Sequence, residues 1–128
     1  MEAMSELPRV ESLMKRALEL DEGFYYGGPH LFMGIWFASR PKIAGGDLKK
    51  AQGHFLKAFD FGEGKFLMAY VYYAKYYAQK MMDKDLFIST LQKVLETPAE
   101  ISPDLVLLNT VAKQQAKELL SRVGEYFE

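Results

Sequence analysis

The stretch "AQGHFLKAFD", residues 51–60, spaces its apolar side chains as one face of a helix. Ala51, Phe55 and Ala58 stand at i, i+4 and i+7, so all three lie on the same side of an amphipathic helix. The same spacing occurs in two other sets, namely Val10, Met14, Ala17 and Phe87, Leu91, Val94. The segments around these sets also end alike, in "KRALEL", "LKAFDF" and "QKVLET". Such self-similarity indicates an internal repeat of helical units.

Two longer apolar runs, "LFMGIWFASR" from Leu31 and "VYYAKYYAQK" from Val71, match each other in residue type along their length. Each carries one small residue, Gly34 or Ala74, where two helices could approach closely. Together with the triads, the runs predict helices at about 6–20, 29–40, 47–61, 66–82 and 84–96, and a last helix at about 103–127. At that last helix Ser102 is expected to cap the start and Pro103 to fit the first turn.

These elements predict an all-α fold of antiparallel helix pairs without a sheet, in a single helical-repeat domain over residues 1–128. The A-x₃-F pattern at Ala51 and Phe55, together with Pro98, is typical of tetratricopeptide repeats. Those repeats are helix–turn–helix units of about 34 residues. We therefore expect a tetratricopeptide-like α-solenoid that ends in a long helix.

Composition excludes several classes of function. A chain of 128 residues that is 49% hydrophobic can form one compact core. Its 16 basic and 17 acidic residues are interspersed, without the basic stripe typical of nucleic-acid binding. The absence of cysteine excludes disulfides, thiolate catalysis and zinc–sulfur sites. No signal peptide is recognised at the N-terminus, and no apolar run reaches the roughly 20 residues that span a bilayer.

The segment "SRPKIAGGD", residues 39–47, combines two cations with a double glycine, as phosphate-binding loops do. A Walker-type loop, however, needs a preceding strand and a terminal G-K-[ST], which are missing. The structural interpretation is that Pro41 ends one helix, Gly45 and Gly46 permit positive φ, and Asp47 caps the next helix. A functional insertion remains the alternative, because an ordinary repeat uses a shorter turn.

Catalytic signals are weak. His30 and His54 are far apart in sequence and lie on different predicted helices, without metal-type spacing. We expect His30 near a helix start and His54 in solvent. Asp83 and Asp85 fit capping of a helix start rather than paired catalysis. We therefore predict a protein that is not an enzyme and holds no metal or other cofactor.

The aromatic residues give the best candidate site. Phe66, Tyr70, Tyr73 and Tyr77 share one helical face, and Tyr72 and Tyr76 share another. Five tyrosines on one helix are unfavourable in a dry core, because each buried unpaired hydroxyl costs about 1–3 kcal/mol. We predict that one groove or cavity receives a ligand or partner segment and is bordered by Trp36, Arg40, Tyr72, Lys75 and Tyr76. The alternative is that the aromatic stripe only packs the core.

The segment "FASRPKIAGGDLKKAQGHFLKAF", residues 37–59, resembles the T component of tripartite ATP-independent periplasmic (TRAP) transporters. That family shares an Ala-x-Arg-Pro…Gly-Gly-Asp…Ala-x₃-Phe run, which falls here on Ala38, Arg40, Pro41, Gly45, Gly46, Asp47, Ala51 and Phe55. Further matches are "AYVYYAKYYA", "DKDLF" and "LLNTVAKQQAKELL". The resemblance covers nearly the whole chain and about the C-terminal half of a typical member.

This resemblance implies an all-helical, tetratricopeptide-like accessory protein, usually a periplasmic lipoprotein. It implies association with the extracytoplasmic solute-binding P component, commonly as an oligomer. For such a binding module a small apolar or anionic ligand is a further expectation, and the first helix, which lacks a preceding helix to stack on, predicts a homo-oligomer. The chain departs from the family in lacking a signal, a lipidation cysteine and the N-terminal repeats. The competing interpretation is a generic tetratricopeptide scaffold that binds peptides in the cytoplasm.

Overall fold

A computed structural model describes the backbone of residues 2–127 and the side chains of residues 9–127. Helices joined by short connections make up this range, and no strand occurs in it, which confirms the all-α prediction. The α-helices are α1 (Glu2–Asp21), α2 (Phe24–Ser39), α3 (Leu48–Phe61), α4 (Leu67–Tyr72), α5 (Lys84–Glu96), α6 (Val106–Ser121) and α7 (Val123–Tyr126). Helix α4 continues directly into a π-helix, η2 (Tyr73–Ala78), and three short 3₁₀ turns are η1 (Lys42–Ala44), η3 (Ala99–Ile101) and η4 (Pro103–Leu105).

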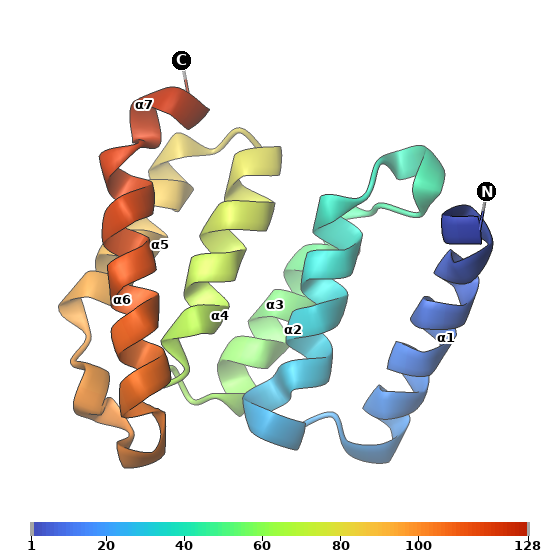
Figure 1. Cartoon of the computed structure of the whole chain (residues 1–128), viewed down its shortest axis with the longest axis horizontal. Coiled ribbons are helices and arrows are strands. Elements are labelled where there is room, and N and C mark those ends of the chain that lie inside the picture. Colours follow the sequence, from blue (N-terminus) through green and yellow to red (C-terminus); the bar gives the residue numbers. More distant parts are fainter. Residues whose placement is uncertain (1, 128) are drawn as a thin grey trace.

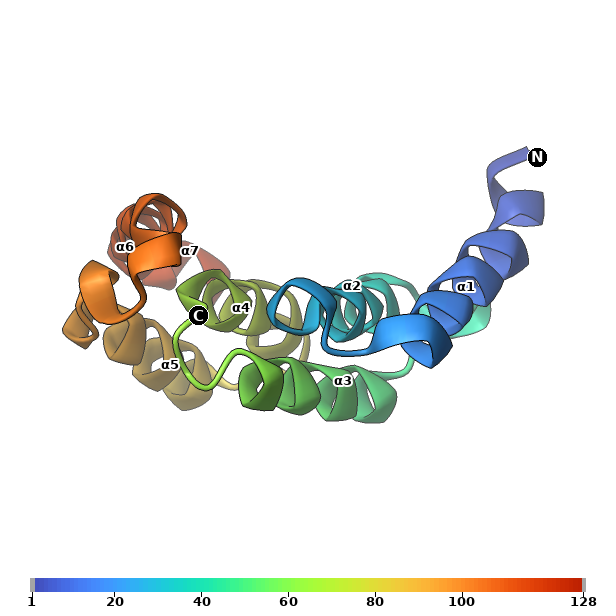
Figure 2. The ribbon, with the colours of Figure 1, turned by 90° about the horizontal axis from the view of Figure 1, so that it is seen from below.

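Successive helices run up and down, with their connections alternating between the two ends of the molecule (Figure 1). Figure 2 shows α2 and α4 in one row and α3 and α5 in a second row beneath them. At the two ends of the molecule, α6 and the first part of α1 rise on the side of α2 and α4. The expected pairs are therefore α2 with α3 and α4–η2 with α5. Two statements stay predictions: that these pairs are tetratricopeptide repeats, and that residues 1–128 form a single domain.

Two of the three apolar triads form the centre of the core. Every side chain of these two sets is at most 1% exposed, namely Ala51, Phe55, Ala58, Phe87, Leu91 and Val94. Gly34 lets α2 approach α3, because a Cβ at this position would lie 2.8 Å from the ring of Phe55. The first triad, on α1, is only half-buried. Helix α1 stands at the end of the row and has a neighbour on one side only.

Several helix ends differ from the predicted ones. Helix α2 begins at Phe24, before the expected residue 29, but Tyr25, Tyr26 and Gly27 have positive φ, so its regular part begins beyond them. Ser102 makes no side-chain cap, which corrects that prediction, whereas Pro103 does occupy the first turn. The long last helix is divided at Arg122 into α6 and α7.

The segment 39–47 has the structural roles predicted for it. Helix α2 ends at Ser39, and Arg40 before Pro41 is extended. Gly45 has φ 96°, while Gly46 is required for another reason: a Cβ there would lie 1.9 Å from the carbonyl oxygen of Arg40. Asp47 caps α3 by accepting a hydrogen bond from the Lys50 amide at 3.1 Å. Asp83 caps α5 in the same way, accepting from the Leu86 amide at 3.0 Å.

Helix α6 joins the two rows through two polar side chains one turn apart. Asn109 is fully buried; its Oδ1 accepts from the Leu67 amide at 3.1 Å, and its Nδ2 donates to the carbonyls of Lys65 at 2.9 Å and Ala99 at 3.3 Å. Lys113 Nζ donates to the carbonyls of Val94, Leu95 and Thr97, at the end of α5. Backbone groups that helix ends leave unpaired thus find partners on α6. Among residues 2–127, no helix is both long and apolar enough to cross a membrane.

Replacing Asn109 with Ala should lower the free energy of unfolding by about 2–4 kcal/mol, because a buried amide and a buried carbonyl each lose a partner. Urea denaturation followed by circular dichroism measures this change. Gln114→Ala, at an exposed position of the same helix, is the control and should change stability by less than about 0.5 kcal/mol. Equal effects of the two substitutions would contradict the role given to Asn109.

Candidate functional site

Two lines of aromatic residues run along α2 and along α4–η2, each with its members four residues apart. On α2 the rings of Phe32 and Trp36 stack with centroids 6.1 Å apart, and the Arg40 guanidinium carbon lies 3.7 Å from the centre of the Trp36 ring. On the second line the rings of Tyr72 and Tyr76 have centroids 6.0 Å apart. Lys75 Nζ lies 5.4 Å from the centre of the Tyr76 ring. Each line therefore pairs rings with a cation.

The predicted site residues differ in how far they reach solvent. Trp36 is 8% exposed, so only its edge is accessible, whereas Lys75 is exposed. Tyr72, Tyr76 and Arg40 are half-buried. The site is therefore a half-buried surface of rings with charged groups on it, not an enclosed chamber.

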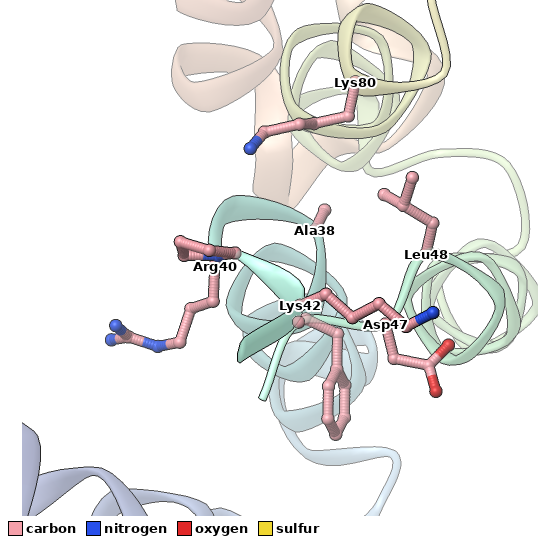
Figure 3. A pocket seen from close by; sticks show the side chains of 9 residues that line it. Ala38, Arg40, Lys42, Asp47, Leu48 and Lys80 are labelled. Carbon is pink, nitrogen blue, oxygen red and sulfur yellow. The ribbon is translucent and has the colours of Figure 1, made fainter. Parts of the chain in front are cut away.

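Two open hollows lie at the end of the molecule where α2 and η2 finish. The first has a volume of about 520 Å³ and is lined by Phe37, Ala38, Arg40, Pro41, Lys42, Gly46, Asp47, Leu48 and Lys80 (Figure 3). The second, of about 530 Å³, is lined by Ser39, Lys75, Tyr76, Gln79, Lys80 and Tyr126. Lys80 borders both hollows. We call the four cations of these hollows, Arg40, Lys42, Lys75 and Lys80, the basic rim.

The structure thus places the five predicted residues near one another but not around one cavity. Arg40 lines the first hollow, and Lys75 and Tyr76 line the second. Trp36 and Tyr72 line neither hollow and instead lie one turn below, in the aromatic lines. The segment 40–47 and helix α7 complete the hollows. The sequence predicted a connector and a terminal helix at these positions, but it did not place either of them at the candidate site. The role of these residues in binding stays a prediction.

The other aromatic face of the second apolar run belongs to the core. Phe66, Tyr70, Tyr73 and Tyr77 are 6–8% exposed. Tyr70 stacks on Phe59 with centroids 4.1 Å apart, and the hydroxyl of Tyr73 accepts a hydrogen bond from Gln52 Nε2 at 3.4 Å. Burial raises the pKa of the Tyr70 and Tyr77 hydroxyls. Of the five tyrosines in this helical run, only Tyr72 and Tyr76 therefore remain available to a partner.

A π-helix positions these two sets of tyrosines. Over Tyr73–Ala78 the backbone widens, and at its end the Gln79 amide donates to the Ala74 carbonyl five residues back. Within it Tyr73, Ala74, Tyr77 and Ala78 are buried, while Lys75 and Tyr76 lie outside. Short π-helical segments inside α-helices are rare and are frequent at functional sites. Residue spacing alone predicted an ordinary helix here.

His30 and His54 form a close pair, which corrects the prediction that they are separate. Their Nδ1 atoms lie 2.9 Å apart, so one imidazole carries the proton and donates to the other. The pair lies between two phenylalanine rings, Phe61 stacked on His30 and Phe37 stacked on His54, each with centroids 5.7 Å apart. His30 lies in the first turn of the regular part of α2, near a helix start as predicted, but it is buried. His54 is half-buried, which corrects the prediction that it is solvated.

A signal for this pair was present in the sequence. His30 is one turn before Gly34 and His54 is adjacent to Phe55, so both flank the predicted contact between α2 and α3. Burial lowers the pKa of His30, with Glu22 opposing that effect. Burial, followed by His30 and by Lys57 and Lys50, lowers the pKa of His54 to about 4. Both imidazoles are therefore neutral at pH 7. Among the described residues, no group of three or more His, Asp or Glu could hold a metal ion.

Because the folded-state pKa of His54 is below the ordinary value of 6.5, the unfolded chain binds more protons as the pH falls. The free energy of unfolding should stay level above about pH 6.5 and decrease from there toward about pH 4. Urea denaturation at a series of pH values measures this. His54→Gln should reduce the slope between pH 5 and 6.5, and the slope that remains belongs to His30, the other histidine of the chain, whose pKa is also lowered. A slope that is the same in both proteins would refute the assignment.

Comparison with known proteins places the chain in one family. The model of the TRAP transporter T-component family matches residues 1–127, essentially the whole chain. No curated protein matches it. The family match agrees with the resemblance carried by the Arg-Pro…Gly-Gly-Asp run of residues 40–47, which here ends α2, turns the chain and caps α3. This chain belongs to the TRAP transporter T-component family.

Proposed function

We propose that the chain is a non-enzymatic accessory protein of a TRAP-type transport system that docks the extracytoplasmic solute-binding P component. The family match is the observation that supports this proposal most strongly. No constellation of catalytic side chains is evident among the described residues. The two histidines, the most conspicuous polar pair, are engaged with each other. Binding, rather than chemistry, is therefore the activity that we assign.

The docking surface that we propose comprises the aromatic lines on α2 and α4–η2 and the basic rim at their ends. Interfaces concentrate their binding energy in tryptophan, tyrosine and arginine side chains. Trp36, Arg40, Tyr72 and Tyr76 supply these three types on neighbouring helices of one row. Phe32 is 40% exposed beside Trp36 and adds apolar area to the same surface. The hollows next to the basic rim could also receive a small apolar or anionic ligand.

The proposal includes assembly as a homo-oligomer through α1, in the periplasm. Helix α1 carries large apolar side chains toward solvent, with Leu13 62% and Leu20 69% exposed. Its triad Val10, Met14, Ala17 is only half-buried. An end helix that exposes such apolar side chains favours association, because stacked helical units need a neighbour or a fully polar cap. The location follows from the partner, which is extracytoplasmic in this transporter class.

The test is capture of the purified solute-binding component of the same transport system by the immobilised chain. Tyr72→Ser combined with Tyr76→Ser should weaken the affinity about tenfold or more, as loss of interface hot spots does. Leu56→Ser is the matched control, since Leu56 is 47% exposed on α3 in the other row. It should leave the affinity unchanged.

The more conservative pair Tyr72→Phe and Tyr76→Phe separates binding from packing. If the hydroxyls serve the partner, affinity falls while the melting temperature stays level or rises. A lower melting temperature with unchanged capture by the folded protein would assign these tyrosines to the core. Absence of capture by the wild-type chain would refute the proposed function itself.

A further inference from the structure

We propose that the basic rim recognises a carboxylate-rich segment of the docked partner protein. This inference rests on the proposed function and specifies its chemistry: the partner presents several acidic side chains to the end of the molecule where α2 and η2 finish. The aromatic lines below the rim then hold the apolar part of the same partner. Four observations support the inference.

The first observation is the excess of positive charge. The two hollows are lined by Arg40, Lys42, Lys75 and Lys80 and by a single carboxylate, that of Asp47. Asp47 already accepts the capping hydrogen bond at the start of α3. Among the side chains of residues 9–127, none of the four cations forms an ion pair. The net charge of the whole chain is −1, so the two hollows are much more positive than the molecule as a whole.

The second observation is the direction of the cationic groups. In Figure 3 the charged ends of Arg40, Lys42 and Lys80 point different ways around the hollow and do not converge on one point. A site for one small anion needs donors that meet at the anion. Spread cations instead match several negative charges distributed along a chain. This geometry favours an acidic protein segment over a single small ligand.

The third observation is the fixed position of the Arg40 guanidinium. The Trp36 ring covers one of its faces at 3.7 Å, and its Nε is buried without a hydrogen-bond partner among the described residues. A guanidinium that is stacked on a ring can still bind a carboxylate through its edge. Because Nε of Arg40 is buried, the terminal Nη atoms are the donors that we expect a carboxylate to reach. Because stacking already restricts the side chain, less conformational entropy is lost when the carboxylate binds. Arg40 is therefore the residue that we expect to contribute most.

The fourth observation is the charge of the opposite end of the molecule. The chain segments at that end are those around 21–22, 60–65 and 96–104. Of their charged residues only Lys65 is basic, and the others are acidic, namely Asp21, Glu22, Asp60, Glu63, Glu96, Glu100 and Asp104. Separation of charge along a molecule orients an approaching charged partner. An acidic segment is repelled from this end and guided to the basic rim. The same separation makes a second copy of the chain a competing occupant, which the experiment must distinguish.

A purely local explanation covers part of the rim. Cations near the C-terminal end of a helix interact favourably with the helix dipole. Arg40 follows the last residue of α2, and Lys80 follows η2. Lys42, in the turn η1, has no such role. Lys75 lies within η2, five residues before the end of the helical run, which extends through Lys80. The dipole therefore does not account for all four cations.

The experiment titrates the chain with a dye-labelled peptide of ten glutamates and measures fluorescence anisotropy at low and at physiological salt. Binding should be saturable and should weaken as salt increases. Trp36 is the single tryptophan of the chain, so its emission should change with the same midpoint. Arg40→Gln combined with Lys80→Gln should weaken peptide binding at least tenfold. Lys57→Gln combined with Lys117→Gln, exposed cations on α3 and α6, should leave it within about twofold.

Three outcomes would overturn the inference. The first is that the labelled peptide does not bind at low salt. The second is that both double substitutions weaken peptide binding equally. The third is that free glutamate displaces the labelled peptide as effectively as unlabelled peptide does at the same carboxylate concentration. The third outcome would indicate a small-anion site instead. Sedimentation velocity tests a fourth outcome, self-association of the chain. If the rim substitutions abolish self-association and the glutamate peptide also disrupts it, the rim binds a second copy of the chain and the inference is overturned.

Capture of the solute-binding component distinguishes this inference from the proposed function. If capture is strong but insensitive to salt and to Arg40→Gln with Lys80→Gln, the acidic-segment inference fails and the docking function stands. If the chain binds the glutamate peptide at the rim but captures no solute-binding component, the docking function fails. The inference that the rim binds carboxylates would then remain valid, but with a different partner protein.

Discussion

The buried amide of Asn109 is the interaction on which the arrangement of the C-terminal half depends. A polar side chain with no exposed surface is tolerated only when its hydrogen bonds are made. Asn109 satisfies this condition in one geometry, with the start of α4 on one side and the turn η3 on the other. Since α4 leads directly into η2, the position of Asn109 also fixes where the second aromatic line begins. The proposed binding surface thus depends on a contact at the far end of the same helical run.

The contact between α2 and α3 has a different character, because it is determined by size. Gly34 leaves no room for a Cβ beside the Phe55 ring, so the two helices lie close together along this line. One turn away, the same closeness brings the two imidazoles within hydrogen-bond distance. The stacked rings on either side help to bury the pair, and burial is the largest of the effects that disfavour the charged form of His54. The close helix contact that Gly34 permits therefore also produces the buried histidine pair and lowers the pKa of its members.

The sequence predicted the helices well because their signals are local. Apolar triads and capping aspartates act within a few residues, so Phe55, Phe87, Asp47 and Asp83 have the roles expected for them. Contacts between helices were predicted less well, since they depend on which faces meet in space. The histidine pair spans 24 positions and the Asn109 contacts span up to 44. The candidate site shows the same division: the line from Trp36 to Arg40 follows from helix spacing, whereas the division into two hollows depends on the segment 40–47 and α7.

The division of the tyrosines explains how one helix can serve both the core and a partner. Tyr70, Tyr73 and Tyr77 bury their rings against α3 and one another, and Gln52 provides a partner for the hydroxyl of Tyr73. Tyr72 and Tyr76 lie on the other side, where a hydroxyl costs nothing because water can reach it. In the α2 line the corresponding residues are Phe32 and Trp36, and their polar group is the Arg40 guanidinium at the end of the line. Both lines thus combine ring area with polar groups at one edge, an arrangement suited to a partner that is apolar in its middle and acidic at its end.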